Sequence, residues 1–192
     1  MLERGEKYLD GYKKRCLDVV VSGVALFTTS PLVVGLALLK YVEDRENPFF
    51  VQDRVGKGGE IIKIIKIRSM RSGSEPDEIR VTTIGRWLRK THLDELPQFF
   101  LVMRGDMTIV GPRPITIGAL DDAIKKRGPQ GEQMRSDYMS LKSGLTGIWQ
   151  VNGTGYDRDY LMYHPNRYYL REGNMISDLR IIVKTVKKVL KV

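Results

Sequence analysis

Two adjacent carboxylates, Asp94 and Glu95, are the side chains of this sequence best suited to chemistry. Arg89 precedes them and Pro97 follows them. Because proline is tolerated only in the first turn of a helix, Pro97 predicts a helix that begins close to Asp94. The N–H groups of a helix N-terminus favour an ionised carboxylate and can receive phosphate. An ionised Asp94 in such a place could act as a nucleophile toward phosphorus or as a magnesium ligand.

A structural role fits the same residues. Asp94 could simply be the N-cap of the helix, or Thr91 and Asp94 could form a capping box. Other catalytic patterns are missing from the sequence, which contains no Walker A, GxGxxG or HExxH motif. His92 and His164 are not near a nucleophile elbow, which argues against a Ser–His–Asp triad.

The charge balance restricts the partners. The 192 residues carry 32 Lys and Arg against 23 Asp and Glu, a formal net charge of +9. With 42% hydrophobic residues the chain can bury a real core, which argues against a disordered tail. The single cysteine, Cys16, excludes an internal disulfide. The excess charge fits nucleic acid, an anionic membrane surface or a phosphorylated substrate.

One segment is unusually apolar. Residues 19–39 are 21 residues without a charge, long enough as a helix to cross the roughly 30 Å of a bilayer core. Ser30-Pro31 lies near its middle, where proline breaks or kinks a helix, and both flanks are basic. We therefore predict a re-entrant helix–break–helix membrane hairpin over residues 12–40, with a Pro-kinked spanning helix as the alternative.

The remaining sequence predicts a small β-hairpin and several helices. Strands are expected at 49–54 and 60–68 around a glycine-rich turn, and helices at 79–90, 93–103 and 117–138, the last interrupted at Gly128-Pro129. Residues 143–155 are expected to form a loop. Residues 178–192 alternate apolar residues and lysines at helical spacing, which predicts an amphipathic helix on an anionic membrane surface or, alternatively, packed on a core. The expected fold is a single α+β, mostly helical domain over 1–192.

The sequence resembles the bacterial sugar transferases known as monotopic phosphoglycosyl transferases, in their minimal catalytic form. The resemblance runs from about residue 11 to the C-terminus, and it is carried by the order of these segments: Lys14-Arg15 with Asp18, Ser30-Pro31, Gln52-Asp53-Arg54-Val55-Gly56, Lys66-Ile67-Arg68-Ser69-Met70, Leu93-Asp94-Glu95-Leu96-Pro97-Gln98, Arg104-Gly105-Asp106-Met107, Val110-Gly111-Pro112-Arg113-Pro114, Gly144-Leu145-Thr146-Gly147 and Gln150-Val151-Asn152-Gly153.

The resemblance implies a function and a site. A member of this family transfers a sugar 1-phosphate from a UDP-sugar to polyprenol (undecaprenyl) phosphate and releases UMP, as the first membrane step of glycan assembly. Asp94 would be the nucleophile and a ligand of Mg²⁺, and Glu95 would complete the catalytic pair. The remaining expected site residues are Lys66, Arg68 and Arg89 for phosphate, Pro112, Arg113 and Pro114 in the nucleotide loop, and Ser30 and Pro31 at the membrane break.

The implied location is the cytoplasmic face of the bacterial inner membrane, with anionic phospholipid and no nucleic acid as partners. A basic, membrane-anchored adaptor without catalytic activity is the first alternative. A nucleic-acid-binding protein is the second, and the 21-residue apolar run argues against it.

Overall fold

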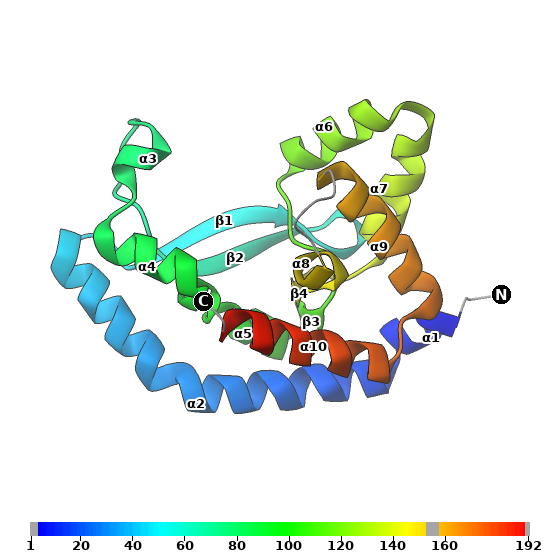
Figure 1. Ribbon diagram of the computed structural model, residues 1–192, viewed down its shortest axis with the longest axis horizontal. Helices are drawn as coiled ribbons and strands as arrows, with labels where there is room; N and C mark the ends of the chain where they lie inside the picture. Colours follow the sequence, from blue (N-terminus) through cyan, green and yellow to red (C-terminus); the bar gives the residue numbers. More distant parts are fainter. Residues whose placement is uncertain (1–3, 153–157, 191–192) are drawn as a thin grey trace.

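The computed structural model describes residues 4–152 and 158–190, and most of them are helical (Figure 1). Residues 153–157 and 191–192, which include Gly153 of the last motif and the end of the predicted C-terminal helix, lie outside the described residues. The elements in chain order are α1 (Arg4–Leu9), α2 (Tyr12–Asp44), β1 (Phe49–Val55), η1 (Lys57–Gly59), β2 (Ile61–Ile67), α3 (Asp77–Arg80), α4 (Thr83–Thr91), η2 (Leu93–Glu95), α5 (Gln98–Arg104), β3 (Thr108–Val110), α6 (Ile117–Arg127), η3 (Gly128–Gln130), α7 (Gly131–Ser140), β4 (Gly144–Thr146), α8 (Ile148–Asn152), α9 (Arg158–Glu172) and α10 (Met175–Val189).

The apolar segment forms one continuous helix, α2, with Pro31 inside it. The predicted helix–break–helix is therefore wrong in this respect: the helix bends but does not stop, and Figure 1 shows it running along the lower edge and then turning upward. Pro31 cannot donate to the carbonyl of Phe27, but the Ser30 hydroxyl donates to that oxygen instead, at 3.4 Å. The Thr28 and Thr29 hydroxyls likewise donate to carbonyls one turn earlier. These local hydrogen bonds let the helix continue through proline.

Most of α2 is exposed along its apolar surface. Phe27 is 85% exposed, and several other large apolar residues of the helix are more than half exposed. Among the residues that the structure describes, α2 is the one helix long and apolar enough to cross a membrane. A soluble core helix would bury such side chains, so burial within the protein does not explain the composition of α2.

The predicted β-hairpin is confirmed. β1 and β2 pair antiparallel, with Phe50 opposite Lys66 and Arg54 opposite Ile62. Because side chains of an antiparallel pair alternate between faces, these four residues and Ile64 share one face of the hairpin. The turn between the strands places Gly58 at φ 70°, a left-handed conformation that glycine adopts without steric cost.

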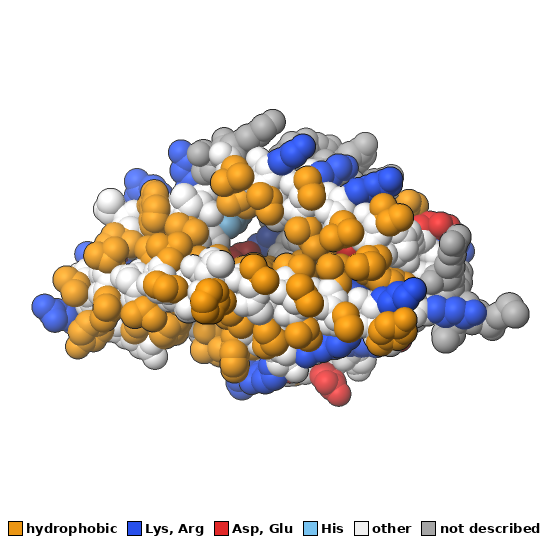
Figure 2. All heavy atoms as spheres, turned by 90° about the horizontal axis from the view of Figure 1, so that it is seen from below, with side chains coloured by type: hydrophobic (Ala, Val, Ile, Leu, Met, Phe, Trp, Pro, Cys, Tyr) orange, Lys and Arg blue, Asp and Glu red, His pale blue; other side chains and the backbone are white. Residues whose placement is uncertain are grey.

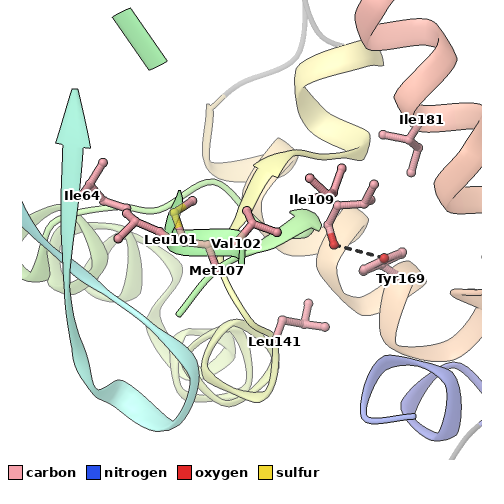
Figure 3. Packing of buried hydrophobic residues seen from close by; sticks show 9 residues of the cluster. Ile64, Leu101, Val102, Met107, Ile109, Leu141, Tyr169 and Ile181 are labelled. Carbon is pink, nitrogen blue, oxygen red and sulfur yellow. Dashed lines mark hydrogen bonds between the residues drawn. The ribbon is translucent and has the colours of Figure 1, made fainter. Parts of the chain in front are cut away.

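A second, parallel pair joins β3 to β4, where the sequence predicts only a loop over residues 143–155. These strands are three residues long, and α8 follows directly. The β3 side chains of Ile109 and Val110 meet the β-hairpin and α5 in the main core, and Figure 3 shows the Tyr169 hydroxyl beside the carbonyl oxygen at the end of β3, at 3.2 Å. The labelled members of this core are Ile64, Leu101, Val102, Met107, Ile109, Leu141, Tyr169 and Ile181.

The C-terminal helix is confirmed but starts earlier than predicted, at Met175, because Asn174 forms a capping box with Ser177. Ile181 packs into the main core, whereas Val183, Val186 and Leu190 are exposed beside the lysines. The face of the molecule that carries α2 and α10 is covered with hydrophobic side chains (Figure 2). Packing on the core therefore accounts for only one side of α10.

A buried ionic cluster ties the two ends of the chain together. The ammonium of Lys14 lies 3.1 Å from Asp18 and 2.9 Å from Asp178, and all three side chains are nearly inaccessible to solvent. Asp178 also accepts hydrogen bonds from the hydroxyls of Tyr8 at 2.8 Å and Tyr169 at 2.5 Å. Because a buried charge is costly without partners, this cluster fixes α1, α9 and α10 against the start of α2.

Candidate active site

Asp94 lies in η2, the short 3₁₀ turn that connects α4 to α5. His92, at φ 58°, reverses the chain between α4 and this turn. Pro97 itself is the N-cap residue of α5, so the expectation that Asp94 is the helix N-cap is wrong. The capping box is also not formed, because the Thr91 hydroxyl donates to carbonyls of its own helix. Neither of the two expected capping roles is therefore formed, and the chemical role of Asp94 stays a prediction.

The environment of Asp94 favours a protonated carboxyl. The side chain is buried, with 7% of its surface exposed. Burial raises the pKa of Asp94, and the neighbouring carboxylate of Glu95 raises it further, whereas the charge of Lys66 lowers it. Lys66 therefore counteracts, in part, the effects of burial and of Glu95 on the pKa of Asp94.

Lys66 and Glu95 form the closest ion pair of the site. The ammonium of Lys66 lies 2.5 Å from a carboxylate oxygen of Glu95, and each side chain is about one quarter exposed. Strand β2 supplies Lys66, since β2 packs against η2 and its alternation points Lys66 to the same face as the buried Ile64. The structure thus brings together Asp94, Glu95 and Lys66 as the sequence predicts.

Arg54 is a further candidate that the sequence analysis did not single out. It lies on the same face of the hairpin as Lys66, four residue pairs along the register. Burial lowers the pKa of Arg54, the nearby charge of Arg113 lowers it further, and Glu95 counteracts them. Arg54 therefore lies within electrostatic reach of both Arg113 and Glu95. From the sequence alone, strand alternation could have placed Arg54 on the face of Lys66 but not near Glu95 or Arg113.

Tyr138 holds the loop that carries Arg113. Its hydroxyl lies 3.0 Å from the carbonyl oxygen of Arg113 and 3.2 Å from that of Val55, and it accepts the backbone N–H of Ile115. The carbonyl of Pro112 accepts from the backbone N–H of Gly144 at 2.8 Å. The Pro112–Pro114 loop is therefore attached both to the end of β1, next to Arg54, and to β4.

Two of the predicted phosphate-binding cations are engaged elsewhere. Arg68 is buried and pairs with Asp44 and Glu46 at the end of α2. Arg89 donates from Nε to the Ser69 hydroxyl at 2.7 Å and from its guanidinium to the Met70 sulfur. In the described structure these side chains brace the segment after β2, and phosphate binding by Arg68 and Arg89 stays a prediction.

The donor set fits magnesium only together with a phosphorylated ligand. Among the described residues no group of three or more His, Cys, Asp or Glu side chains is placed to hold a metal ion. Mg²⁺ usually takes one or two carboxylates and completes its octahedron with water and substrate phosphates. Asp94, with Glu95 beside it, offers this kind of incomplete set.

The apolar face of the molecule is hollowed at one place. Figure 2 shows an opening among the hydrophobic side chains, with acidic and basic side chains at its floor and a histidine at its edge. Charged groups are thus reachable through a surface that is otherwise suited to hydrocarbon.

Comparisons with known proteins assign the chain to a family. The family model of the bacterial sugar transferases matches residues 9–192, and the chain belongs to this family. It is 33% identical over 205 residues to the galactosyl transferase CpsE of Streptococcus agalactiae, covering 96% of this chain and 43% of that protein. It is 32% identical over 215 residues to the undecaprenyl-phosphate galactose phosphotransferase of Salmonella typhimurium, covering 100% of this chain and 42% of that protein.

A shorter relative is the exopolysaccharide production protein ExoY of Sinorhizobium fredii, with 30% identity over 205 residues, 94% of this chain and 87% of that protein. The chain therefore spans about two fifths of the length of the two longer relatives and most of the length of ExoY.

Proposed function

We propose that this chain acts as one catalytic unit that transfers a sugar 1-phosphate from a UDP-sugar to a polyprenol phosphate. The observation that carries the proposal is the buried Asp94 beside the Glu95–Lys66 ion pair, with Arg54 and Arg113 in the surroundings. The printed name of the Salmonella typhimurium relative, which specifies undecaprenyl phosphate and galactose, supports the same substrate class.

In the proposed reaction, an ionised Asp94 oxygen attacks the phosphorus atom that carries the sugar. The bond from that phosphorus to the bridging oxygen breaks, and UMP leaves with the electron pair. An oxygen of polyprenol phosphate then attacks the same phosphorus and displaces the Asp94 carboxylate, giving a polyprenyl diphosphate sugar. Two displacements avoid a direct encounter of the two anionic substrates.

The charged side chains have separate tasks in this scheme. Lys66 favours the ionised, nucleophilic form of Asp94, which burial and Glu95 oppose. Arg54 and Arg113 would neutralise charge on the diphosphate, since phosphoryl transfer depends mainly on positioning and charge stabilisation. Bound Mg²⁺, which we propose Asp94 helps to hold, would supply further charge neutralisation at the diphosphate.

The direct test compares Asp94→Asn with Asp53→Asn, a matched change at an exposed aspartate of β1. With a panel of UDP-sugars, polyprenol phosphate and Mg²⁺, Asp94→Asn should reduce UMP release by at least about three orders of magnitude, because nucleophile variants lose most of the acceleration. Asp53→Asn should keep it. Without polyprenol phosphate, the native protein alone should gain the mass of the phosphosugar.

Two outcomes contradict the proposal. Full turnover by Asp94→Asn would exclude this residue as the nucleophile. Absence of UMP release by the native protein with every UDP-sugar would favour the alternative, a membrane-anchored adaptor without catalytic activity. Loss of activity on chelation and recovery with Mg²⁺ would test the metal separately.

We further propose that α2 enters and leaves the cytoplasmic leaflet of the bacterial inner membrane. The bend at Pro31 and the exposed apolar residues of α2 and α10 support this arrangement. The exposed Cys16 and a cysteine introduced as Asn47→Cys mark the two ends of α2. A membrane-impermeant maleimide should label neither position in intact cells and both in permeabilised cells. Labelling of one position in intact cells would establish a spanning helix.

A further inference from the structure

A second charged site lies outside the proposed active site, at the start of α2. A cavity of about 280 Å³ opens where the α1–α2 junction, η1, the end of α7 and β3 meet. Four cationic side chains line it, and two carboxylates accompany them. The cations are Lys14, Arg15, Lys57 and Lys142, and the carboxylates are Asp10 and Asp18.

The carboxylates are already committed to two of the cations. Asp18 pairs with Lys14 and also accepts hydrogen bonds from the Thr108 hydroxyl and the Ile109 backbone N–H. Asp10 pairs with Lys57. The other two lining cations, Arg15 and Lys142, therefore form no ion pair with these carboxylates.

Arg15 is held in place by backbone oxygens instead. Its guanidinium donates to the carbonyls of Val102 and Met103, at 2.8 and 2.6 Å, at the end of α5. These hydrogen bonds fix its position but do not cancel its charge. In the described parts of the chain, neither Arg15 nor Lys142 takes part in an ion pair.

The pKa of Lys142 is lowered. Burial is the largest cause and the like charge of Arg15 the next, with a smaller effect of Lys57, whereas Asp18 and Asp10 act in the opposite direction. The N-terminus of α2 adds to the positive potential, because its N-cap is Gly11, no side chain caps it and its first turn contains no acidic residue. An anion in the cavity would relieve all of these contributions together.

We propose that this cavity binds the phosphate group of an anionic ligand, between Lys142, Arg15 and the first turn of α2. Phosphate matches point-charge ammonium groups and free helix N–H groups, and it occurs both in lipid headgroups and in soluble phosphates. The ligand would also brace the chain next to the active site. Lys142 precedes Ser143, whose hydroxyl donates to the carbonyl of Val55, and Gly144, whose N–H donates to Pro112.

Lysine reactivity tests the proposal without depending on catalysis. The native protein in maltoside detergent micelles, which contain no phosphate, is treated with an uncharged acetylating reagent at pH 7.5, and each lysine is followed by mass spectrometry. One arm adds inorganic phosphate or pyrophosphate against chloride at equal ionic strength. A second arm adds phosphatidylglycerol to the micelles, with no inorganic phosphate. Lys13 and Lys125, both exposed, are the internal controls.

Bound phosphate should slow acetylation of Lys142, by about tenfold for each unit by which it raises the pKa of that ammonium. Lys13, the neighbour of Lys14 on α2, should change little. Selective protection in the first arm identifies a soluble phosphate as ligand, and selective protection in the second identifies a lipid headgroup. Equal effects on Lys142 and the controls, or no protection in either arm, would overturn the proposal.

Discussion

The ammonium of Lys66 lies 2.5 Å from a carboxylate oxygen of Glu95, the residue that follows Asp94. Strand β2 thereby influences the ionisation of the Asp94 carboxyl, which lies 28 residues after Lys66 in the chain. Lys66 lowers the pKa of Asp94 directly, and its pairing with Glu95 offsets the carboxylate that raises it. Without Lys66, burial and Glu95 would raise the pKa of Asp94 further.

The pH dependence of turnover should respond to both partners of this pair, with opposite signs. Activity requires ionised Asp94 and should fall as the pH drops through its pKa. Lys66→Met removes a charge that lowers this pKa, so the acidic limb of the kcat profile should move to higher pH. Glu95→Gln removes a charge that raises the pKa, so the limb should move to lower pH.

Lys63→Met is the matched control for Lys66→Met, because Lys63 lies on β2 but is exposed on the opposite face. Its profile should match that of the native protein. If Lys66→Met and Glu95→Gln moved the acidic limb in the same direction, Asp94 would not be the titrating group.

Asp94→Asn should stabilise the protein while abolishing turnover. The folded state raises the pKa of Asp94, so the ionised carboxylate is disfavoured by folding. This cost is fully present above the folded pKa and disappears as the pH falls through the unfolded value of about 3.9. Each kcal/mol regained corresponds to about 2–4 °C in Tm for a chain of this size.

Thermal unfolding in detergent at pH 7.5 and near pH 4 measures this difference. The gain of Asp94→Asn over the native protein should be largest at pH 7.5 and shrink toward pH 4. Asp53→Asn, at an exposed position, should show no such trend. A lower Tm for Asp94→Asn at pH 7.5 would contradict the burial cost of this carboxylate.

Tyr138→Phe should loosen the loop that carries Arg113. The change removes a buried hydroxyl near the carbonyls of Val55 and Arg113, so we expect a loss of about 1–3 kcal/mol in the free energy of unfolding. If the proposed nucleotide loop binds the donor, KM for the UDP-sugar should rise more than kcat falls. Tyr168→Phe, at an exposed tyrosine, is the control. A loss of stability with unchanged KM would show that the contacts of the Tyr138 hydroxyl with this loop do not position the donor.

Lys14→Met should be strongly destabilising, because it removes the charge from a buried ionic cluster. It leaves Asp18 and Asp178 buried without their cation, which costs about 3–5 kcal/mol. Chemical denaturation in detergent should show this loss for Lys14→Met and little change for Lys13→Met, at the exposed neighbour. Equal stability of both variants would mean that the other hydrogen bonds, from the tyrosine hydroxyls to Asp178 and from Thr108 and Ile109 to Asp18, satisfy the two carboxylates without Lys14.

The sequence predicted those elements whose stabilising contacts are local. Alternating Ile and Lys residues around a glycine turn specify the β1–β2 hairpin, and Gly128-Pro129 divides α6 from α7. Strands β3 and β4 escaped prediction, because three-residue strands in a glycine-rich region become strands only when they pair across the fold. The continuity of α2 through Pro31 depends on hydroxyl hydrogen bonds that a simple helix-breaking rule ignores.

The sequence motif singled out Asp94 and Glu95 as candidate site residues, and the structure places both in the turn η2. The roles of individual cations were less accessible, because charge in a sequence does not reveal its partner. Arg68 carries the expected charge but pairs with Asp44 and Glu46, whereas Arg54 reaches the surroundings of Glu95. The two arginines differ in position: Arg54 lies within the paired residues of the hairpin, and Arg68 follows the end of β2.

The hydrogen bond between Tyr8 and Asp178 joins residues that are 170 positions apart, and the same carboxylate pairs with Lys14. On the ribosome, α2 is made and can reach the membrane long before residue 178 is synthesised. During that interval Lys14 has only Asp18 on its own helix as a carboxylate partner and must stay hydrated. The ionic cluster at the start of α2 is therefore complete only once α10 has been made, so an element near one end of this sequence depends on an element near the other.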